Sequence, residues 1–215
     1  MNDVSATRKN ISGYQYSSST AIHSVHYLAG PIINALKAIG AKRVLDIGCG
    51  NGSITRLLYK NGFQIVGLDP SSQGVACCRS LMPNAVFYEM GVYDAPTSFP
   101  ENEFDAVISS EVIEHLYSPQ FLPHFAKAKL RTHGHFILTT PYHGYFKNLV
   151  LSLAGKWDSH WMPMREGGHI KLWSAKTLNN LLDSTGFDIW RTVGCGRYPF
   201  LWKSLLVIAR KRCDV

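Results

Sequence analysis

A glycine-rich stretch between a short apolar run and a helical pattern constrains this chain more than any other feature. Residues 43–47 (RVLDI) form the apolar run, and Gly48, Gly50 and Gly52 follow it at once. Ile54, Leu57 and Leu58 then recur at helical spacing. Glycine lets the backbone turn sharply and come close to a ligand, and the start of a helix offers free N–H groups. We therefore expect a buried strand, a tight ligand-binding loop and a helix.

Strand and helix patterns alternate along most of the chain. Apolar runs predict strands at residues 43–47, 64–68, 85–88, 104–109 and 135–139. Apolar periodicity predicts helices at 23–39, from a Ser53 cap to Gly62, at 71–80, at 119–131 and from Ser174 to Gly186. Such alternation indicates βαβ units with right-handed crossovers. Residues 187–193 and 201–210 predict a terminal hairpin. The fold class is therefore α/β, a Rossmann-like doubly wound sheet with helices on both faces.

Length and composition indicate one domain without a membrane span. The 215 residues suffice for one core, and no apolar run approaches the ~18 to 20 residues of a transmembrane helix. The first ten residues lack a signal-peptide pattern, so we expect a cytoplasmic protein. The net charge of +7 permits nucleic acid as a partner, but we find no dense basic stripe. Five cysteines without C-x-x-C spacing argue against a disulfide framework.

Two carboxylates give the glycine-rich loop its chemistry. The glycines are spaced G-x-G-x-G, whereas a pyrophosphate-binding loop would be G-x-G-x-x-G. Asp46 stands two residues before the first glycine, where its charge would repel a pyrophosphate but suits an amino-acid ammonium group. Asp69 ends the next strand and is placed to accept hydrogen bonds from two ribose hydroxyls. The combination predicts a nucleoside ligand that carries an amino-acid head group.

These residues resemble a known cofactor signature. Residues 44–58 with Leu68-Asp69 look like the S-adenosylmethionine signature of the class I methyltransferases, and residues 104–108 (FDAVI) resemble the fourth-strand motif of that family. The resemblance implies S-adenosylmethionine as cofactor and a seven-stranded sheet, parallel except for a reversed last strand. It implies a methyltransferase domain over residues 41–215, with an acceptor-site insertion at about 141–173. Residues 1–40 would form an N-terminal segment and helix that cover the site.

The resemblance also implies a set of cofactor-binding residues. The methionine end would lie against Asp46, Gly48, Cys49, Gly50, Asn51 and Gly52. Asp69 and Pro70 would hold the ribose side, and Tyr93, Asp94 and Ser110 would complete the site, with Asp94 near the adenine. The sequence departs from the family here, because Tyr93-Asp94-Ala95-Pro96 replaces the commoner Gly-Asp-Ala.

A second motif follows the fourth expected strand. Glu111, Glu114 and His115 lie close together in sequence, and His169 lies in the insertion. Two carboxylates and two imidazoles can bind a divalent cation such as Mg²⁺, Mn²⁺, Fe²⁺ or Zn²⁺. The arrangement is similar to the metal site of small-RNA 2′-O-methyltransferases. Glu-Val-x-Glu-His also resembles the corresponding segment of the ubiquinone-biosynthesis O-methyltransferases, whose substrates are catechols. Both families methylate one of two vicinal hydroxyls.

Two other interpretations of this motif stay open. In the first, no metal is bound and a side chain acts as general base, with His115, Glu111 and His143 as candidate catalytic residues and His169 as a further candidate. In the second, Glu-x-x-Glu-His is a solvated turn with a structural role. If one helical turn forms at this position, Glu111 and Glu114 share a face.

The leading functional hypothesis is O-methylation of a phenolic, catechol-like or vicinal-diol small molecule. Aromatic residues that include Tyr142, Tyr145, Trp157 and Trp161, with Met162 and Met164, indicate an aromatic or lipophilic acceptor. The alternatives are an RNA ribose 2′-O-methyltransferase, a C- or N-methyltransferase and a module that binds S-adenosylmethionine without catalysis. The loop pattern disfavours an NAD-dependent oxidoreductase.

Overall fold

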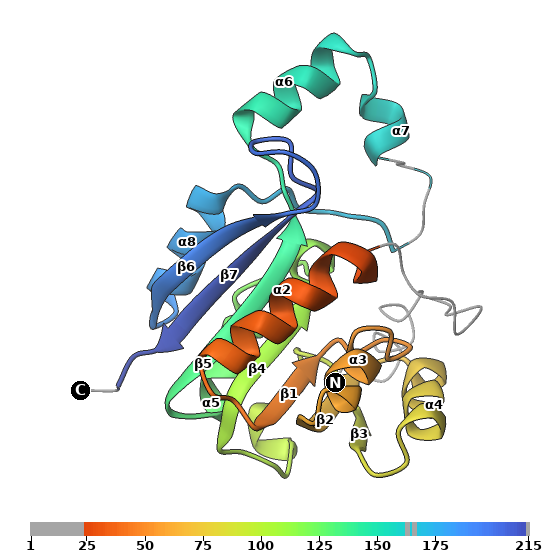
Figure 1. Ribbon diagram of the computed structural model, residues 1–215, viewed down its shortest axis with the longest axis vertical. Coiled ribbons are helices and arrows are strands. Elements are labelled where there is room, and N and C mark those ends of the chain that lie inside the picture. Colours follow the sequence, from red (N-terminus) through yellow and green to blue (C-terminus); the bar gives the residue numbers. More distant parts are fainter. Residues whose placement is uncertain (1–23, 162–163, 165–166, 214–215) are drawn as a thin grey trace, which may run out of the picture.

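The computed structural model describes residues 24–161, 164 and 167–213, and it contains a seven-stranded mixed sheet (Figure 1). The strand order is β3-β2-β1-β4-β5-β7-β6, and all neighbours run parallel except β7, which is antiparallel to β5 and to β6. The strands are β1 (Arg43–Ile47), β2 (Gln64–Asp69), β3 (Val86–Glu89), β4 (Phe104–Ser110), β5 (Leu130–Pro141), β6 (Phe187–Cys195) and β7 (Ser204–Lys211). The expected α/β sheet with a reversed last strand is confirmed.

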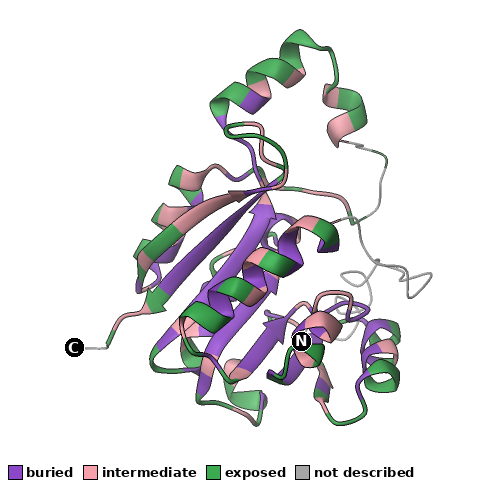
Figure 2. Ribbon diagram, viewed as in Figure 1, coloured by how far each residue is buried: buried purple, intermediate pink, exposed green. Residues whose placement is uncertain are grey.

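Helices cover both faces of the sheet because successive strand residues point to opposite sides. On one face α2 (Val25–Ala38) and α3 (Thr55–Lys60) pack against Val44 of β1 and its neighbours. On the other, α5 (Phe121–Lys129) packs on β4 and β5 and α8 (Ala175–Ser184) on β6 and β7, in a core that includes Leu45. Helix α4 (Ser72–Leu81) packs beside β3. The central strands are therefore buried on both faces (Figure 2).

Two helix starts follow the sequence expectation and one does not. The hydroxyl of Ser71 accepts a hydrogen bond from the N–H of Gly74 at the start of α4. Ser174 and Thr177 form a reciprocal capping box at the start of α8. Ser53, expected to cap α3, instead donates to Asn51 Oδ1 at 2.6 Å, and α3 begins without a side-chain cap. The Ser53 prediction was wrong because α3 begins at Thr55, so Ile54 occupies the N-cap position.

Strand β5 is longer than expected, and α5 is shorter. The helix ends at Lys129, whose buried ammonium donates to the carbonyl oxygen of Phe99 at 2.9 Å. Leu130 then pairs with Phe104 of β4. Residues 132–134, expected to connect the helix at 119–131 to the strand at 135–139, lie inside the strand, where His133 has φ 61° and the pairing register shifts. A bulge therefore replaces the predicted loop.

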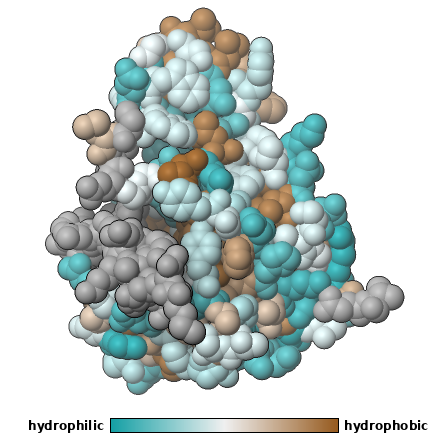
Figure 3. Space-filling model, turned by 180° about the vertical axis from the view of Figure 1, so that it is seen from behind, coloured by the Kyte–Doolittle hydropathy of each residue, from teal (hydrophilic) through white to brown (hydrophobic). Residues whose placement is uncertain are grey.

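Residues 141–173, expected as a loop insertion, contain two helices. Helix α6 (Tyr145–Leu153) stands away from the sheet and α7 (Trp157–Trp161) follows it (Figure 1). Apolar side chains gather at the tip of the molecule among polar ones (Figure 3), because α6 exposes Tyr145, Phe146, Leu149, Val150 and Leu153. No helix in the described part of the chain is long and apolar enough to cross a membrane.

Candidate functional site

The loop between β1 and α3 has the backbone conformation that only glycine adopts easily. Gly48 has φ 81°, and a Cβ at this position would lie 2.4 Å from Cγ2 of Val112. Gly52 has φ 78°, and a Cβ there would lie 2.9 Å from Sγ of Cys78. The N–H groups of Gly48 and Cys49 both donate to the carbonyl oxygen of Leu68, at 2.8 and 3.1 Å. The loop is thus fixed to the end of β2.

Asp46 presents a buried carboxylate beside this loop. Asp46 is 3% exposed, and its Oδ2 accepts a hydrogen bond from Oγ1 of Thr55 at 2.6 Å. Burial raises the pKa of Asp46 to about 7, and the bond from Thr55 opposes that rise. No cation pairs with this carboxyl group among the described residues. A ligand ammonium group would stabilise its charged form.

Asp69 connects the end of β2 to the same loop. Its two oxygens accept hydrogen bonds from the N–H groups of Gly50 and Ser71, both at 2.8 Å. Burial raises the pKa of Asp69, and these two bonds oppose the rise. A carboxylate oxygen has further lone pairs, so both oxygens can still accept bonds from ribose hydroxyls. Asp46 and Asp69 are on neighbouring strands, and their charges interact.

The other predicted cofactor residues lie in or beside the loops at this edge of the sheet. Asn51 is buried, and its Oδ1 accepts from both the N–H and the hydroxyl of Ser53. Pro70 directly follows Asp69. After β3, Asp94 Oδ2 accepts from the N–H of Gly91 at 2.9 Å and so stabilises its own turn. Tyr93 packs edge-on against Phe121, and the hydroxyl of Ser110 lies 2.9 Å from that of Thr139.

A carboxylate and two imidazoles converge beyond β4. Glu114 is 1% exposed, and its Oε1 lies 3.8 Å from Nε2 of His115 and 3.9 Å from Nε2 of His169. Each of the three residues offers a ligand atom within 4.8 Å of the others. Oε2 of Glu114 accepts a hydrogen bond from Thr140 at 3.0 Å, but the buried Oε1 has no hydrogen-bond partner among the described residues.

Hydrogen bonds join the two chain segments that carry the histidines of this cluster. The carbonyl oxygen of Glu114 accepts from the N–H groups of Ile170 and Lys171, at 2.9 and 3.1 Å. Nδ1 of His115 lies 3.1 Å from the carbonyl oxygen of Gly168. The short 3₁₀ helix η2 (Ile113–His115) is therefore joined to the segment that carries His169. Burial, and then the charge of Glu111, raise the pKa of Glu114 well above its usual value.

Glu111 lies apart from the three-residue cluster. It has φ 57°, so it precedes the 3₁₀ turn rather than sharing a helical face with Glu114. Its oxygens accept hydrogen bonds from the hydroxyls of Thr139 and Ser204, at 3.1 and 3.2 Å. Burial raises the pKa of Glu111 to about 7. The condition for a shared face is not met, because the left-handed backbone turns Glu111 toward β5 and β7.

His143 lies beside the site rather than within its cavity. Its residue is 6% exposed, and its backbone N–H donates to the carbonyl oxygen of Trp173 at 2.9 Å. Burial, and then the positive charge of Lys147, lower the pKa of His143 to about 4. Its ring centroid is 5.3 Å from that of His160, which does line the cavity. The imidazole of His143 is thus neutral at pH 7.

A cavity of about 400 Å³ opens beside Glu111 and His169. Apolar groups from α6 and from the loop between β6 and β7 form part of its wall, including Val150, Leu151, Tyr198 and Leu201. Three cationic side chains, Lys147, Arg197 and Lys203, also line it. These three cations could not be grouped from the sequence, because they meet only when the two segments fold back onto one cavity. Members of the predicted aromatic wall do not line this cavity: Tyr142, Tyr145, Trp157, Trp161 and Met164 are absent from its lining, and Met162 lies outside the described residues.

A sheet of this order, with a glycine-rich loop after β1 and acids on β1 and β2, defines the Rossmann-like S-adenosylmethionine-dependent methyltransferases. A family model described as "Methyltransferase domain" matches residues 19–192, and the chain belongs to this family. The chain is therefore an enzyme of the methyltransferase type, and its cofactor is S-adenosylmethionine.

Curated relatives include proteins named for ubiquinone biosynthesis. The chain is 26% identical over 204 residues to the mitochondrial ubiquinone biosynthesis O-methyltransferase of Homo sapiens, which covers 83% of this chain and 53% of that protein. It is 28% identical over 135 residues to the ubiquinone biosynthesis O-methyltransferase of Bradyrhizobium diazoefficiens, with 61% and 52% covered. The chain thus spans about half the length of these two relatives.

Solved structures share the fold. Magnesium protoporphyrin IX methyltransferase from Synechocystis, with bound SAH, superposes with a TM-score of 0.65 at 18% identity, over 86% of this chain and 82% of that one. An S-adenosylmethionine-dependent methyltransferase from Clostridium acetobutylicum gives a TM-score of 0.66 at 11% identity, over 86% and 91%. At these identities the likeness concerns the fold.

Proposed function

We propose that this enzyme methylates one hydroxyl of a phenolic, catechol-like or vicinal-diol small molecule, with a divalent cation bound by Glu114, His115 and His169. The single observation that carries the proposal is the buried Oε1 of Glu114, which faces two imidazole nitrogens at 3.8 and 3.9 Å. These distances are too long for hydrogen bonds. They suit three ligands around one ion, because one carboxylate oxygen and two imidazoles are a common ligand set for such metals.

The cofactor side follows from the two buried acids. Asp46 would hold the ammonium group and Asp69 the ribose hydroxyls, while the backbone of residues 48–52 approaches the methionine end. S-adenosylmethionine supplies a methyl group on a cationic sulfur. Asn51, Pro70, Tyr93, Asp94 and Ser110 would complete this side, as the family resemblance implies.

The acceptor side needs a proton acceptor and a means of orienting a hydroxyl. A divalent cation, when bound, lowers the pKa of a coordinated oxygen and can hold two vicinal oxygens. Glu111 lines the cavity with His169, and its pKa of about 7 suits a general base near neutral pH. We assign this role to Glu111 in preference to His143, which is buried and does not line the cavity. The apolar cavity wall supports an aromatic or lipophilic acceptor.

We keep the division of the chain into a methyltransferase domain over residues 41–215 and an acceptor-site insertion within it. The insertion at 141–173 would provide acceptor contacts, since Lys147, Val150, Leu151 and His160 of this region line the cavity. RNA ribose 2′-O-methylation is the second candidate, because the ribose diol offers the same two oxygens and the chain carries a net charge of +7. Salt-sensitive binding of short RNA ends would favour it.

The test combines metal analysis with turnover. We expect the purified enzyme to contain a divalent metal, to lose turnover of catechols in excess chelator and to regain it with Mg²⁺, Mn²⁺, Fe²⁺ or Zn²⁺. Glu114→Gln and His169→Ala should lower metal content and turnover together. His124→Ala, on the exposed side of α5, is the matched control and should change neither. Full activity in chelator, with no gain on metal addition, would refute the metal. Binding of S-adenosylmethionine without transfer to any acceptor would instead indicate a non-catalytic module.

A further inference from the structure

Positive charge dominates the acceptor cavity. Lys147 comes from α6, whereas Arg197 and Lys203 come from the segment between β6 and β7. Glu111 is the acid among the described lining residues, so the three cationic side chains outnumber it. The cavity therefore carries an excess of cations over anions, which in a partly enclosed space attracts a negatively charged ligand.

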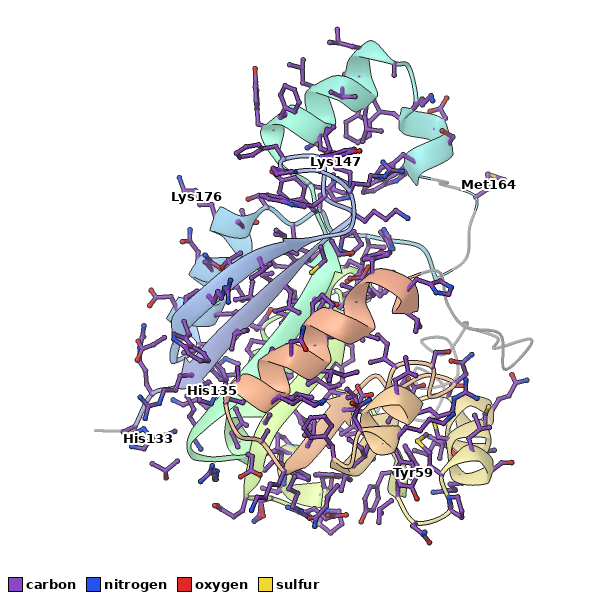
Figure 4. The ribbon with its side chains drawn as sticks, in the orientation of Figure 1. Tyr59, His133, His135, Lys147, Met164 and Lys176 are labelled. Carbon is purple, nitrogen blue, oxygen red and sulfur yellow. The ribbon has the colours of Figure 1, made fainter. Side chains whose placement is uncertain are left out.

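Lys147 is oriented against the usual pattern of a surface helix. Its residue is 8% exposed, whereas Tyr145 and Leu153 of the same helix are 84% and 81% exposed. Helix α6 thus buries its cation and exposes its apolar residues. Figure 4 shows Lys147 at the end of α6 that joins the body of the molecule. Burial of an unpaired ammonium group is costly, so this orientation calls for a compensating partner.

The described residues supply only part of that compensation. Nζ of Lys147 donates to the carbonyl oxygen of Tyr142 at 2.7 Å, and no carboxylate forms an ion pair with it within the described chain. An ammonium group has three donors, so two remain for a ligand in the cavity. Burial, and then the charge of Arg197, lower the pKa of Lys147 to about 8, while the negative charge of Glu111 opposes that shift and compensates it in part.

The backbone of Arg197 gives a second, independent reason to expect a ligand at this cavity. Arg197 occupies a left-handed backbone conformation, φ 65°, in the segment that follows β6. A non-glycine residue at such a φ is strained, and strain of this kind is often kept at ligand sites. Its positive charge also lowers the pKa of His160, after burial and the charge of Lys147. Two cations are thus held within electrostatic reach of each other on one cavity.

We propose that Lys147 and Arg197 form an anion-binding subsite of the acceptor cavity, and that the acceptor carries a carboxylate or a phosphate in addition to the hydroxyl that is methylated. The inference rests on the proposed O-methylation and specifies its substrate class. An ammonium group provides a compact point charge, and a guanidinium group provides a planar fork that matches carboxylate and phosphate oxygens. The anion would compensate the buried charge of Lys147, while the apolar wall would contact the remainder of the acceptor.

The experiment compares matched acceptors on the full chain. The probes are 3,4-dihydroxybenzoate, its neutral methyl ester, and a catechol that carries a phosphate ester in place of the carboxylate. We expect kcat/KM to be at least about 30-fold higher for one of the anionic probes than for the ester, mainly through KM, as for other buried charge pairs. Whichever anionic probe is preferred identifies the class of anion.

Two variants of Lys147 and a control separate recognition from structure. Lys147→Met should remove most of the preference for the anion, and Lys147→Arg should restore part of it. Lys176→Met, an exposed position on α8 (Figure 4), should leave the preference unchanged. Circular dichroism and binding of S-adenosylhomocysteine check that each variant folds. Equal turnover of ester and anions by the natural protein, or an unchanged preference in Lys147→Met, would overturn the subsite.

A binding measurement distinguishes this failure from failure of the proposed function. Calorimetric titration of each probe into the S-adenosylhomocysteine complex needs no methyl transfer. If no probe is methylated but the benzoate or the phosphate still binds more tightly than the ester, and Lys147→Met abolishes the difference, the subsite stands and the proposed acceptor is wrong. If methyl transfer occurs without any preference for anions in turnover or binding, the proposed function stands and the subsite is wrong.

Discussion

The buried carboxyl group of Asp46 should make the unliganded protein less stable as the pH rises. The pKa of this group is about 7 in the folded protein, against 3.8 for an exposed aspartate. The folded state therefore binds the proton more tightly, and stability is lost as the pH rises from about 4 through 7. Across that window the loss approaches about 4 kcal/mol, at 1.36 kcal/mol for each unit of pKa difference.

Asp46→Asn removes this titration and keeps an oxygen that can accept the hydrogen bond from Thr55. Relative to the natural protein, we expect the variant to gain about 2 to 3 kcal/mol of unfolding free energy between pH 5 and pH 8. The same change should abolish binding of S-adenosylmethionine, because the neutral amide does not compensate an ammonium group. The variant would then be more stable and inactive, a known trade-off at functional sites.

Urea unfolding at pH 5, 6, 7 and 8, without cofactor, measures the effect, and calorimetry measures cofactor binding. Asp105→Asn is the matched control. Although partial burial opposes it, hydrogen bonds from the N–H groups of Arg43 and Lys42, both at 2.8 Å, lower the pKa of Asp105. That variant should lose stability above about pH 4, and the loss should vanish as the pH falls through the folded pKa. A constant difference between Asp46→Asn and the natural protein at all four pH values would refute the reasoning.

Three further substitutions test the packing. Gly48→Ala should cost about 1 to 3 kcal/mol and weaken cofactor binding, since it combines a left-handed φ with a Cβ 2.4 Å from Val112; unchanged stability and affinity would contradict the loop geometry. Gly30→Ala in α2 should instead stabilise by about 0.5 to 1 kcal/mol, because a Cβ there meets nothing within 4 Å, and a loss would show that this space is occupied. Leu182→Ala, at a fully buried position of α8, should cost about 2 to 5 kcal/mol in urea unfolding; a cost under about 1 kcal/mol would place Leu182 outside the core.

The sheet and the cofactor loop could be predicted because their signals are local. Apolar runs mark β1, β2 and β4 to within a residue, and the capping residues Ser71 and Ser174 mark two helix starts. The positions of Asp46 and Asp69 at the carboxyl edge of the sheet follow directly from the strand ends. Each of these features depends on residues that lie close together in the sequence.

The acceptor side was harder to predict because it depends on distant segments. Helix α6 exposes its apolar residues and buries Lys147. An apolar stripe normally marks the side of a helix that faces the core, so the sequence of α6 does not predict how it packs. Glu111 was grouped with Glu114, but its left-handed backbone directs it toward Ser204, 93 residues away. The early start of β5 depends on the pairing of Leu130 with Phe104.

The arrangement of the sheet also separates two parts of the chain that can change independently. Most of the side chains that line the proposed acceptor cavity come from the end of β5 onward, in residues 141–169 and 197–204, whereas the glycine-rich loop and its two acids precede β3. Substitutions in the late segments can therefore reshape the cavity while the early half of the sheet keeps its hydrogen bonds and its core. A scaffold divided in this way can acquire new acceptors without having to rebuild its methyl-donor site.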